Sequence, residues 1–523
     1  MSEIVLKENI KEDKLGVVSV PKLLAKMSLP AIFSMLIMSL YNIVDGLFVA
    51  KSSLDALEAL NLAFPLQQIM LAFALGIGVG TSTIVARRLG EKNKPSADNL
   101  AQNGLKIAIV TTMIFMILGS FLPKLFMQIF TQKNSVVTMG TQYLTICMVC
   151  CFGMMIEITI SKVLQATGNM IIPMLSQLLG AITNIVFDPI FIFVCDLGII
   201  GAGIATVMGQ IFSMIFVLIL ASRKRHVIDL MFKIKHCRDI PISFKAFKEI
   251  VRIGLPVMIM NAVAGIIVIF MNKIISGYNP QATNALGNYF KLQSFVFMPV
   301  FGLNQGALPI MSYNFGANKE KRYMQTFLIS LFVSLAIMTV GLIIFQLCPE
   351  FLISFYKNES DIEQYNQLVK VGVVTLRVIS WSFLFAAVNI IVTTGYQAIG
   401  YGVTSLIMSL LRQVILILPL AILFGKFLGG LDVLWWSYPV SDAIVMIIFT
   451  PYYFFAYKKA FAKRRKIAEV YSPQSEALAT TENNEESSKD VPLEALVVSD
   501  TIERESQEIN RAEIESNMEN ADN

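Results

Sequence analysis

Acidic residues within long apolar stretches are the part of this sequence with the clearest chemical meaning. Tyr41 and Asp45 are four residues apart, and Asn184 and Asp188 have the same spacing, so each pair shares one face of a helix. If the two faces meet, two carboxylates, an amide and a phenol come together, and Thr206 can add a hydroxyl. Because two carboxylates in an apolar pocket cannot easily both ionise, this cluster suits a shared proton or a sodium ion held by Asp45, Asn184 and Asp188.

Pro189 directly follows Asp188 and carries no backbone donor. It frees the carbonyl of Ile185 and favours a kink, so we predict a hinge beside the acid, with that carbonyl as a further cation ligand. The alternative is that these polar groups are hydrogen bonds between helices that hold a bundle together. An ionised aspartate at the centre of a membrane helix costs about 2.5–3.5 kcal/mol, so either role needs a physical reason.

Five other polar side chains in or near apolar runs are candidates to line a substrate path. Lys291 could attract anions or exclude cations, whereas Arg412 could instead pair with helix ends or lipid head groups. Asp442 is expected near the end of its apolar run, where a charged group can reach the interface. The five candidates are Glu157, Gln67, Gln293, Lys291 and Arg412.

The composition indicates an integral membrane protein. Of the 523 residues, 55% are hydrophobic and 15% are charged, and the mean hydropathy is +0.64. A soluble chain has about a quarter of its residues charged. With two histidines in the whole chain, histidine catalysis and histidine-ligated metal sites are nearly excluded. We therefore expect no enzymatic activity, no resident metal and no cofactor other than a coupling ion, H+ or Na+.

The charges are divided unevenly along the chain. Residues 469–523 contain 15 acidic and 3 basic residues, whereas residues 1–468 contain 22 acidic and 39 basic residues. The acidic tail has too few clustered apolar side chains to fold alone, so we predict that it is disordered. The basic, apolar body is expected to contact anionic membrane lipid and no nucleic acid.

Twelve apolar runs are long enough to cross the hydrocarbon core, which takes about 20 residues of helix. Their continuous hydrophobicity favours helices over strands. With twelve spans, the Lys- and Arg-rich loops fall on one side, which predicts a multi-pass protein of the cell membrane with both termini in the cytoplasm. The predicted spans are residues 27–50, 59–86, 103–123, 139–163, 171–194, 199–222, 252–276, 285–312, 326–348, 370–394, 403–424 and 432–457.

An internal repeat relates the two halves of the chain. Six spans per half begin and end on the same side, so the halves are parallel repeats, a layout typical of transporters with a substrate path between them. At one constant offset, Leu29, Pro30, Gly76, Gly80 and Gly90 recur as Leu255, Pro256, Gly302, Gly306 and Gly316. At a slightly larger offset, Gln165, Ala166 and Gly168 recur as Gln397, Ala398 and Gly400.

This repeat predicts the domain organisation. Two six-helix lobes occupy residues 27–222 and 252–457, joined by a cytoplasmic linker at residues 223–251. A cytoplasmic segment of residues 1–26 comes first, and a basic juxtamembrane stretch with the acidic tail follows at residues 458–523.

Several of these motifs carry a family resemblance: the repeated Leu-Pro, Gly76-x-x-x-Gly80, Gln165-Ala166-Thr167-Gly168 and the segment from Asn184 to Pro189. Over about residues 20–460 the chain resembles the multidrug and toxic compound extrusion (MATE) family, in the DinF-like subgroup and its MepA-type branch. The resemblance implies an all-α, V-shaped transporter of two six-helix lobes. It also implies that Tyr41, Asp45, Asn184, Asp188 and Thr206 form the family's cation site in the first lobe.

We therefore expect a monomeric antiporter that exports organic cations or amphipathic drugs by alternating access, driven by protons or sodium ions. Two other functions stay open. A lipid or lipid-linked oligosaccharide flippase would have more spans and a cationic cavity, to which Lys291, Arg377 and Arg412 could contribute. A membrane-bound enzyme would need a loop with clustered acids or histidines at an interface, which this sequence does not offer.

Overall fold

The computed structural model describes residues 14–223, 243–278, 280–354 and 362–482. Within these helices, the side chains of residues 14, 41–47, 50–52, 54, 57, 264–266, 269, 280–281, 362–365 and 467–482 lie outside the described residues. Every element in the described residues is a helix. The chain forms two units, Met1–Ala462 and Lys463–Asn523, and the first unit contains both sequence repeats.

The first repeat folds into a lobe made of helices α2 to α9, preceded by the short helix α1. Long apolar runs with few breakers explain the long helices, and Pro or Asn residues at several helix starts favour initiation there. The elements are α1 (Lys14–Val17), α2 (Val20–Ser52), α3 (Leu54–Gly90), α4 (Lys94–Gly119), α5 (Leu122–Phe130), α6 (Asn134–Val149), α7 (Phe152–Ala166), α8 (Ile171–Pro189), the π-helix η1 (Ile190–Val194) and α9 (Gly198–Arg223).

The second repeat folds into a lobe that begins with α11 at Phe244, before residue 252, where the sequence placed it. Its last helix, α20, continues past Ala462 into the second unit. The elements are α11 (Phe244–Ser276), α12 (Pro280–Gly316), α13 (Glu320–Leu347), α14 (Pro349–Ser354), α15 (Ile362–Ser380), α16 (Ser382–Ile399), α17 (Gly402–Leu410), η2 (Leu411–Ile417), α18 (Leu418–Leu423), η3 (Phe424–Gly429), α19 (Leu431–Leu434) and α20 (Ser437–Glu482).

The described helices agree with an all-α membrane fold. Ten of them are long and apolar enough to cross a membrane, and α6 with α7, bent by 47° at their junction, makes an eleventh if the pair is one span. The remaining predicted span, residues 252–276, lies in α11, where several side chains are outside the described residues. The acidic tail, predicted to be disordered, falls on residues 483–523 and is also outside them, whereas α20 is helical to Glu482.

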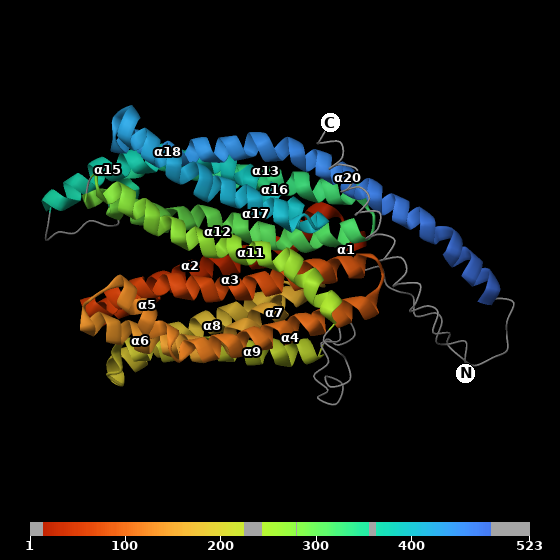
Figure 1. Ribbon diagram of the computed structural model, residues 1–523, viewed down its shortest axis with the longest axis horizontal. Coiled ribbons are helices and arrows are strands. Elements are labelled where there is room, and N and C mark those ends of the chain that lie inside the picture. The colour runs from red at the N-terminus through yellow and green to blue at the C-terminus, as the bar shows by residue number, and fades with distance from the viewer. Residues whose placement is uncertain (1–13, 224–242, 279, 355–361, 483–523) are drawn as a thin grey trace, which may run out of the picture. The chain divides into compact units, whose positions relative to one another are not determined.

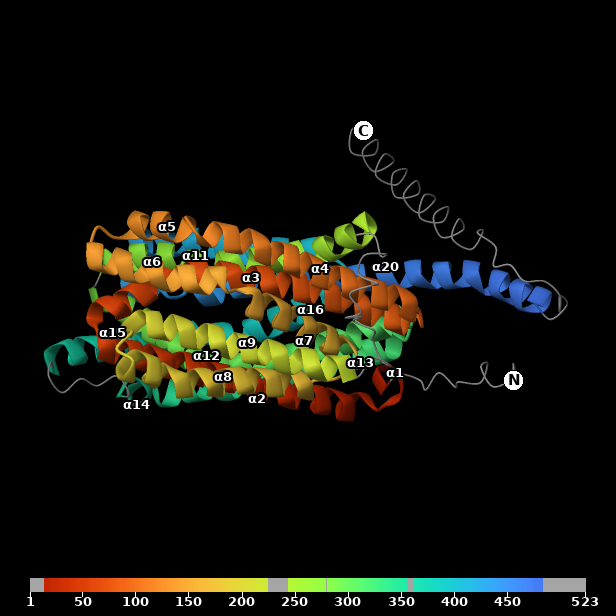
Figure 2. The same ribbon diagram turned by 90° about the horizontal axis from the view of Figure 1, so that it is seen from below.

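Four helices form most of the contact between the lobes. α2 packs along α12 and α3 packs along α11. Figure 1 shows these four helices between the other helices of the two lobes, and Figure 2 shows α3 with α11 along one side of the molecule and α2 with α12 along the other. Since α2 and α3 are the repeat equivalents of α11 and α12, the contact has approximate two-fold symmetry. Residues that are equivalent in the two sequence repeats therefore make equivalent contacts at this interface.

The repeated glycines explain how closely these helices approach. A Cβ atom on Gly90 would overlap the carbonyl oxygen of Tyr313, and one on Gly316 would overlap that of Arg87. These two contacts exchange under the repeat, because Arg87 and Tyr313 occupy equivalent positions in the two halves, as Gly90 and Gly316 do. Backbone therefore packs on backbone, which only glycine permits.

The same exchange occurs further along the interface. A Cβ on Gly80 would lie 3.0 Å from the backbone nitrogen of Gly254, and a Cβ on Gly306 would overlap the hydroxyl of Ser28. Ser28 and Gly254 occupy equivalent positions in the two halves. The Ser28 hydroxyl also donates to the carbonyl of Leu303 at 3.3 Å. The lobes are thus in direct contact along these segments.

Basic residues gather where α3 and α12 end. Arg87 donates to the carbonyl of Ala398 at 3.1 Å, and its guanidinium lies 5.1 Å from the ring centre of Phe315. Arg322 donates to the carbonyl of Val18 at 2.6 Å, and Lys319 donates to the carbonyl of Gly16 at 3.1 Å. The ends of α3, α12 and α16 and the starts of α2 and α13 therefore lie together, and we refer to this side as the basic end.

We predict that Gly316→Ala destabilises the protein, because the new methyl group would overlap the backbone of Arg87. Overpacking of this kind costs about 1–3 kcal/mol. Gly287→Ala is the matched control on the same helix, since nothing lies within 4 Å of its Cβ position, and alanine favours helix by about 0.5–1 kcal/mol. Thermal unfolding of the purified variants tests this. Equal melting temperatures would contradict a tight interface at Gly316.

Candidate functional site

Asn184, Asp188 and Thr206 lie together as a polar cluster in the first lobe, with Asn184 and Asp188 on the same face of α8 and Thr206 half-buried on α9. Asp188 is fully buried and Asn184 is 2% exposed. With its amide turned to satisfy both neighbours, Asn184 donates to the Asp188 carboxylate at 2.6 Å and accepts from the hydroxyl and backbone N–H of Thr206 at 3.2 and 3.1 Å. The cluster therefore links α8 to α9 through one carboxylate, one amide and one hydroxyl.

Small residues bring α8 and α9 close enough for these bonds. A Cβ on Gly209 would lie 2.7 Å from the carbonyl of Gly180. Nearby, the hydroxyl of Ser213 donates to the carbonyl of Ser176 at 2.8 Å. The one proton of the Ser176 hydroxyl is shared between the carbonyl of Ser213 at 3.0 Å and the carboxylate of Glu157 at 3.1 Å. This close packing places Asn184 on α8 opposite Thr206 on α9.

The partner pair of the predicted cation site lies on α2, which packs against α8. The backbone of α2 is helical through Tyr41 and Asp45, so the two residues share a helix as predicted. Their side chains lie outside the described residues. The meeting of Asp45 with Asp188 therefore stays a prediction.

Pro189 marks a change of helix type beside the acid. The α-helical bonding of α8 ends there, and the next five residues form the π-helix η1. Because proline has no N–H to donate, the regular i to i−4 ladder cannot pass through it. Single-turn π segments are frequent at functional sites, and the role of Pro189 as a hinge stays a prediction.

Glu157 is buried in the first lobe and accepts hydrogen bonds in a second polar network. Its carboxylate accepts from the hydroxyls of Ser161 at 2.7 Å and Ser176 at 3.1 Å. Since Ser176 also bonds to Ser213, this network joins α7, α8 and α9 inside the lobe.

Lys162, which sequence reasoning missed, lies beside this network. It is 8% exposed, and its amine donates to the side-chain oxygens of Gln165 at 3.1 Å and Gln305 at 2.9 Å. Its position in the same apolar run as Glu157 was the signal in the sequence. Gln305 belongs to α12, so this contact crosses between the lobes.

Three of the residues predicted to line a substrate path, Gln67 on α3 and Lys291 and Gln293 on α12, lie in different surroundings. Gln67 donates to the Tyr143 hydroxyl at 2.9 Å and so points into its own lobe. Gln293, its repeat equivalent, is half-buried, and Lys291 is exposed. A shared function as lining residues stays a prediction for them.

Arg412 and Asp442 form an ion pair that sequence reasoning did not anticipate. Asp442 was expected near the interface, but it is fully buried, and one of its oxygens lies 2.6 Å from Nε of Arg412. Asn389 donates to the same oxygen at 3.2 Å. Arg412 therefore pairs with a carboxylate of α20 rather than with helix ends or lipid, because a buried carboxylate needs a countercharge. The sequence could not show that these two residues meet.

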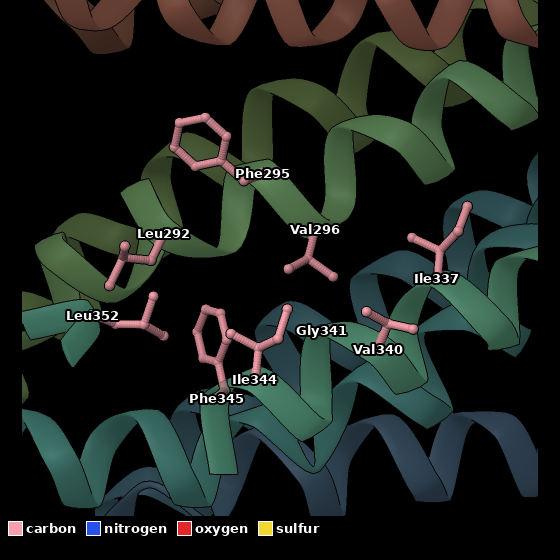
Figure 3. A pocket seen from close by; sticks show the side chains of 9 residues that line it. All are labelled: Leu292, Phe295, Val296, Ile337, Val340, Gly341, Ile344, Phe345 and Leu352. Carbon is pink, nitrogen blue, oxygen red and sulfur yellow. The ribbon is translucent and has the colours of Figure 1, made fainter. Parts of the chain in front are cut away.

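An apolar cavity of about 560 Å³ lies between α12 and α13. Figure 3 shows its side chains, which project from these two helices and, at Leu352, from α14. None of the predicted site residues lines it. The cavity can take an apolar group but offers no charge to bind an ion. Its lining residues are Leu292, Phe295, Val296, Ile337, Val340, Gly341, Ile344, Phe345 and Leu352.

We predict that Arg412→Met lowers the free energy of unfolding by about 3 kcal/mol, because it leaves the Asp442 carboxylate buried without its countercharge. The double variant Arg412→Met with Asp442→Leu should be more stable than Arg412→Met alone, since it removes both charges. Denaturation of the wild type, the two single variants and the double variant in detergent measures this coupling. Additive effects of the two changes would contradict the pairing.

Comparison with known proteins gives the family. A family profile described as MatE matches residues 30–190 and 256–423, two segments that begin at the equivalent prolines of the two repeats. Multidrug export protein MepA of Staphylococcus haemolyticus (strain JCSC1435) is 25% identical over 430 residues, which cover 82% of this chain and 91% of that protein. MepA of Staphylococcus aureus (strain MRSA252) is 23% identical over 425 residues, with 81% and 91% covered.

A solved structure supports the fold. It is described as the outward-facing conformation of a multidrug resistance MATE family transporter of the MOP superfamily. It matches with a TM-score of 0.80 at 22% identity, covering 86% of this chain and 98% of that one. Because the family profile also covers more than half of the chain, this protein belongs to the MatE family of membrane transporters.

Proposed function

We propose that this protein exports cationic or amphipathic drugs from the cell in exchange for a proton or sodium ion. The observation that carries this proposal is the buried Asp188, which accepts a hydrogen bond from Asn184, itself oriented by Thr206, in a lobe of a membrane protein. A carboxylate at that depth is expensive unless it binds something. The names of the relatives, multidrug export proteins, support the substrate class.

The chemistry of the cluster suits a monovalent cation. Asp188 supplies the negative charge, and Asn184 orients it while keeping its own oxygen on Thr206. An acid fixed in this way can take up a proton, or share a sodium ion with the oxygens of Tyr41 and Asp45 on the adjacent α2. We propose that loading of this site changes how α2 packs on α8 and so resets the lobes.

The orientation follows from the charges at the two ends. We propose that the basic end faces the cytoplasm of the cell membrane and that both termini lie there, because positively charged loops stay on that side. At the opposite end Asp55 accepts from Lys133 and from Ser135, so the charges there are mixed. In this orientation the lobes touch at the cytoplasmic side.

In this orientation the contact between the lobes closes the cytoplasmic side of the transporter. The glycine contacts from Gly80 to Gly90 and from Gly306 to Gly316 close the basic end. Alternating access requires these contacts to separate for substrate to enter from the cytoplasm. One elementary charge that crosses 100 mV gives about 2.3 kcal/mol, enough for about a fiftyfold gradient of a neutral substrate.

One of the three basic residues that favoured the flippase alternative, Arg412, is already paired with a carboxylate. A cationic cavity for a lipid pyrophosphate would use Arg412 as a free guanidinium, whereas Arg412 is paired with Asp442. We therefore favour the antiporter, acting on small molecules as a monomer in the lipid bilayer.

We predict that Asp188→Asn abolishes export while the protein still folds, because the amide keeps an oxygen for Asn184 but can neither bind a proton nor neutralise a cation. The measurement uses proteoliposomes with an imposed pH gradient, acidic inside and without sodium, to which an ethidium-like cation is added. Collapse of the gradient in the wild type but not in the variant supports proton antiport through this site.

Asp432→Asn is the matched control, since it makes the same change near the end of a span. It should transport like the wild type. If the wild type gives no response, the same assay with a sodium gradient tests the other ion. Transport by folded Asp188→Asn at the wild-type rate, with either ion, would overturn the proposed function.

A further inference from the structure

Lys162 is a buried cation that lies between the lobes. Its amine donates to Gln165 on its own helix and to Gln305 on α12, and Gln165 also donates to Gln305 at 3.3 Å. Three polar side chains thus form one closed contact between α7 of the first lobe and α12 of the second lobe.

The surroundings hold the lysine in this position. A Cβ on Gly78 would lie 2.8 Å from Cγ of Lys162, so α3 leaves room for the stem of the side chain. The two acceptors are neutral amides, and the nearest charge on the same helix is the carboxylate of Glu157, which accepts hydrogen bonds from the hydroxyls of Ser161 and Ser176. An amine in such a place depends strongly on each of its acceptors.

The second repeat does not contain an equivalent of this lysine contact. Under the offset that relates Gln165 to Gln397, the equivalent of Lys162 is Thr394, whose hydroxyl donates to Asn304 on α12. Both Thr394 and Asn304 belong to the second lobe, so their bond does not cross the interface. The backbone of the interface is therefore two-fold symmetric, but this charged contact across it exists on one side only.

Other directional bonds cross the interface at the basic end: Arg87 donates to the carbonyl of Ala398 at 3.1 Å, and Arg88 pairs with Glu249 at 3.3 Å. Both side chains of the Arg88–Glu249 pair are 30% exposed, so water weakens that pair, whereas Lys162 is buried. Glycine contacts between backbones resist separation only through packing, and Ser28 contributes a single long hydrogen bond to Leu303. When the lobes move apart, Gln305 leaves with α12 while Lys162 and Gln165 stay on α7. The amine then loses one acceptor and gains water, so the contact favours the closed basic end over the open one.

We propose that Lys162 is a positioning residue of the transport cycle: through Gln305 it locks the lobes together at the basic end and must release before that end opens. The inference rests on the proposed alternating access. In this proposal Lys162 shifts the equilibrium between the closed and open states of the basic end and does not contact the coupling ion.

The test measures opening rather than transport. Ser28→Cys places a thiol in the interface, where Ser28 is 2% exposed, in a background whose six native cysteines are replaced by serine or alanine. A membrane-impermeant maleimide is added to inside-out vesicles and, in parallel, to right-side-out vesicles. The rate at which the introduced thiol is labelled reports how often the basic end opens, and to which side.

Lys162→Met removes the lock, and we expect the introduced thiol to label about tenfold faster, which corresponds to about 1.4 kcal/mol. Gln305→Leu removes the acceptor and should act in the same direction. Gln305→Glu turns the contact into a buried ion pair and should slow labelling by about tenfold. Lys162→Arg keeps a charged donor and should label closer to the wild-type rate than Lys162→Met.

Thr394→Val is the matched control, because it breaks the equivalent bond within the second lobe, and it should leave labelling unchanged. Wild-type labelling rates in folded Lys162→Met and in Gln305→Leu would overturn the proposal, as would faster labelling in Gln305→Glu. If the labelling follows the prediction while Asp188→Asn still transports, the lock stands and the coupling site falls, so the two proposals fail separately.

Discussion

The structure depends on the close approach of four helices, α2, α3, α11 and α12, at the contact between the lobes. Lipid is as apolar as the side chains, so helices in a membrane associate through packing and hydrogen bonds rather than through hydrophobic burial. Glycine gives the closest packing, since carbonyl oxygens of one helix lie where a Cβ would be on the other. The polar groups between the lobes, including Lys162, are placed by that backbone contact.

The buried charges follow from a second constraint, the cost of an ionised group away from water. Each one described here has found partners: Asp188 with Asn184, Glu157 with two serines, and Asp442 with Arg412. Such pairs contribute less to stability than their attraction alone suggests, because desolvation offsets much of it. Their value lies in fixing which helix faces which, and Lys162, whose acceptors are neutral amides, spans the contact between the lobes, as the more exposed pair of Arg88 and Glu249 also does.

Much of this arrangement could be predicted from sequence because it is local or repeated. The four-residue spacing of Asn184 and Asp188 placed both on one face of α8, and glycines that recur at a constant offset revealed the repeat, whereas their position at the contact between the lobes came from the structure. The expected position of Asp442 was mistaken, because its partner Arg412 lies on another helix and no spacing rule connects them. Lys162 could have been singled out by its position in the apolar run of Glu157, but its contact with Gln305 in the other lobe could not.

The sequence by itself determined the helices, their apolar lengths, the two-fold repeat and the faces that carry acid, amide and hydroxyl groups, because these depend on residues within a few turns of one another or on a recurring pattern. Only the tertiary structure decided which faces meet: α8 with α9 at the Asp188 cluster, η2 with α20 at the ion pair, and α7 with α12 at Lys162. The physical reason is that apolar faces are interchangeable in a bilayer. The choice among them is made by small steric and polar details that act only once the helices are packed together.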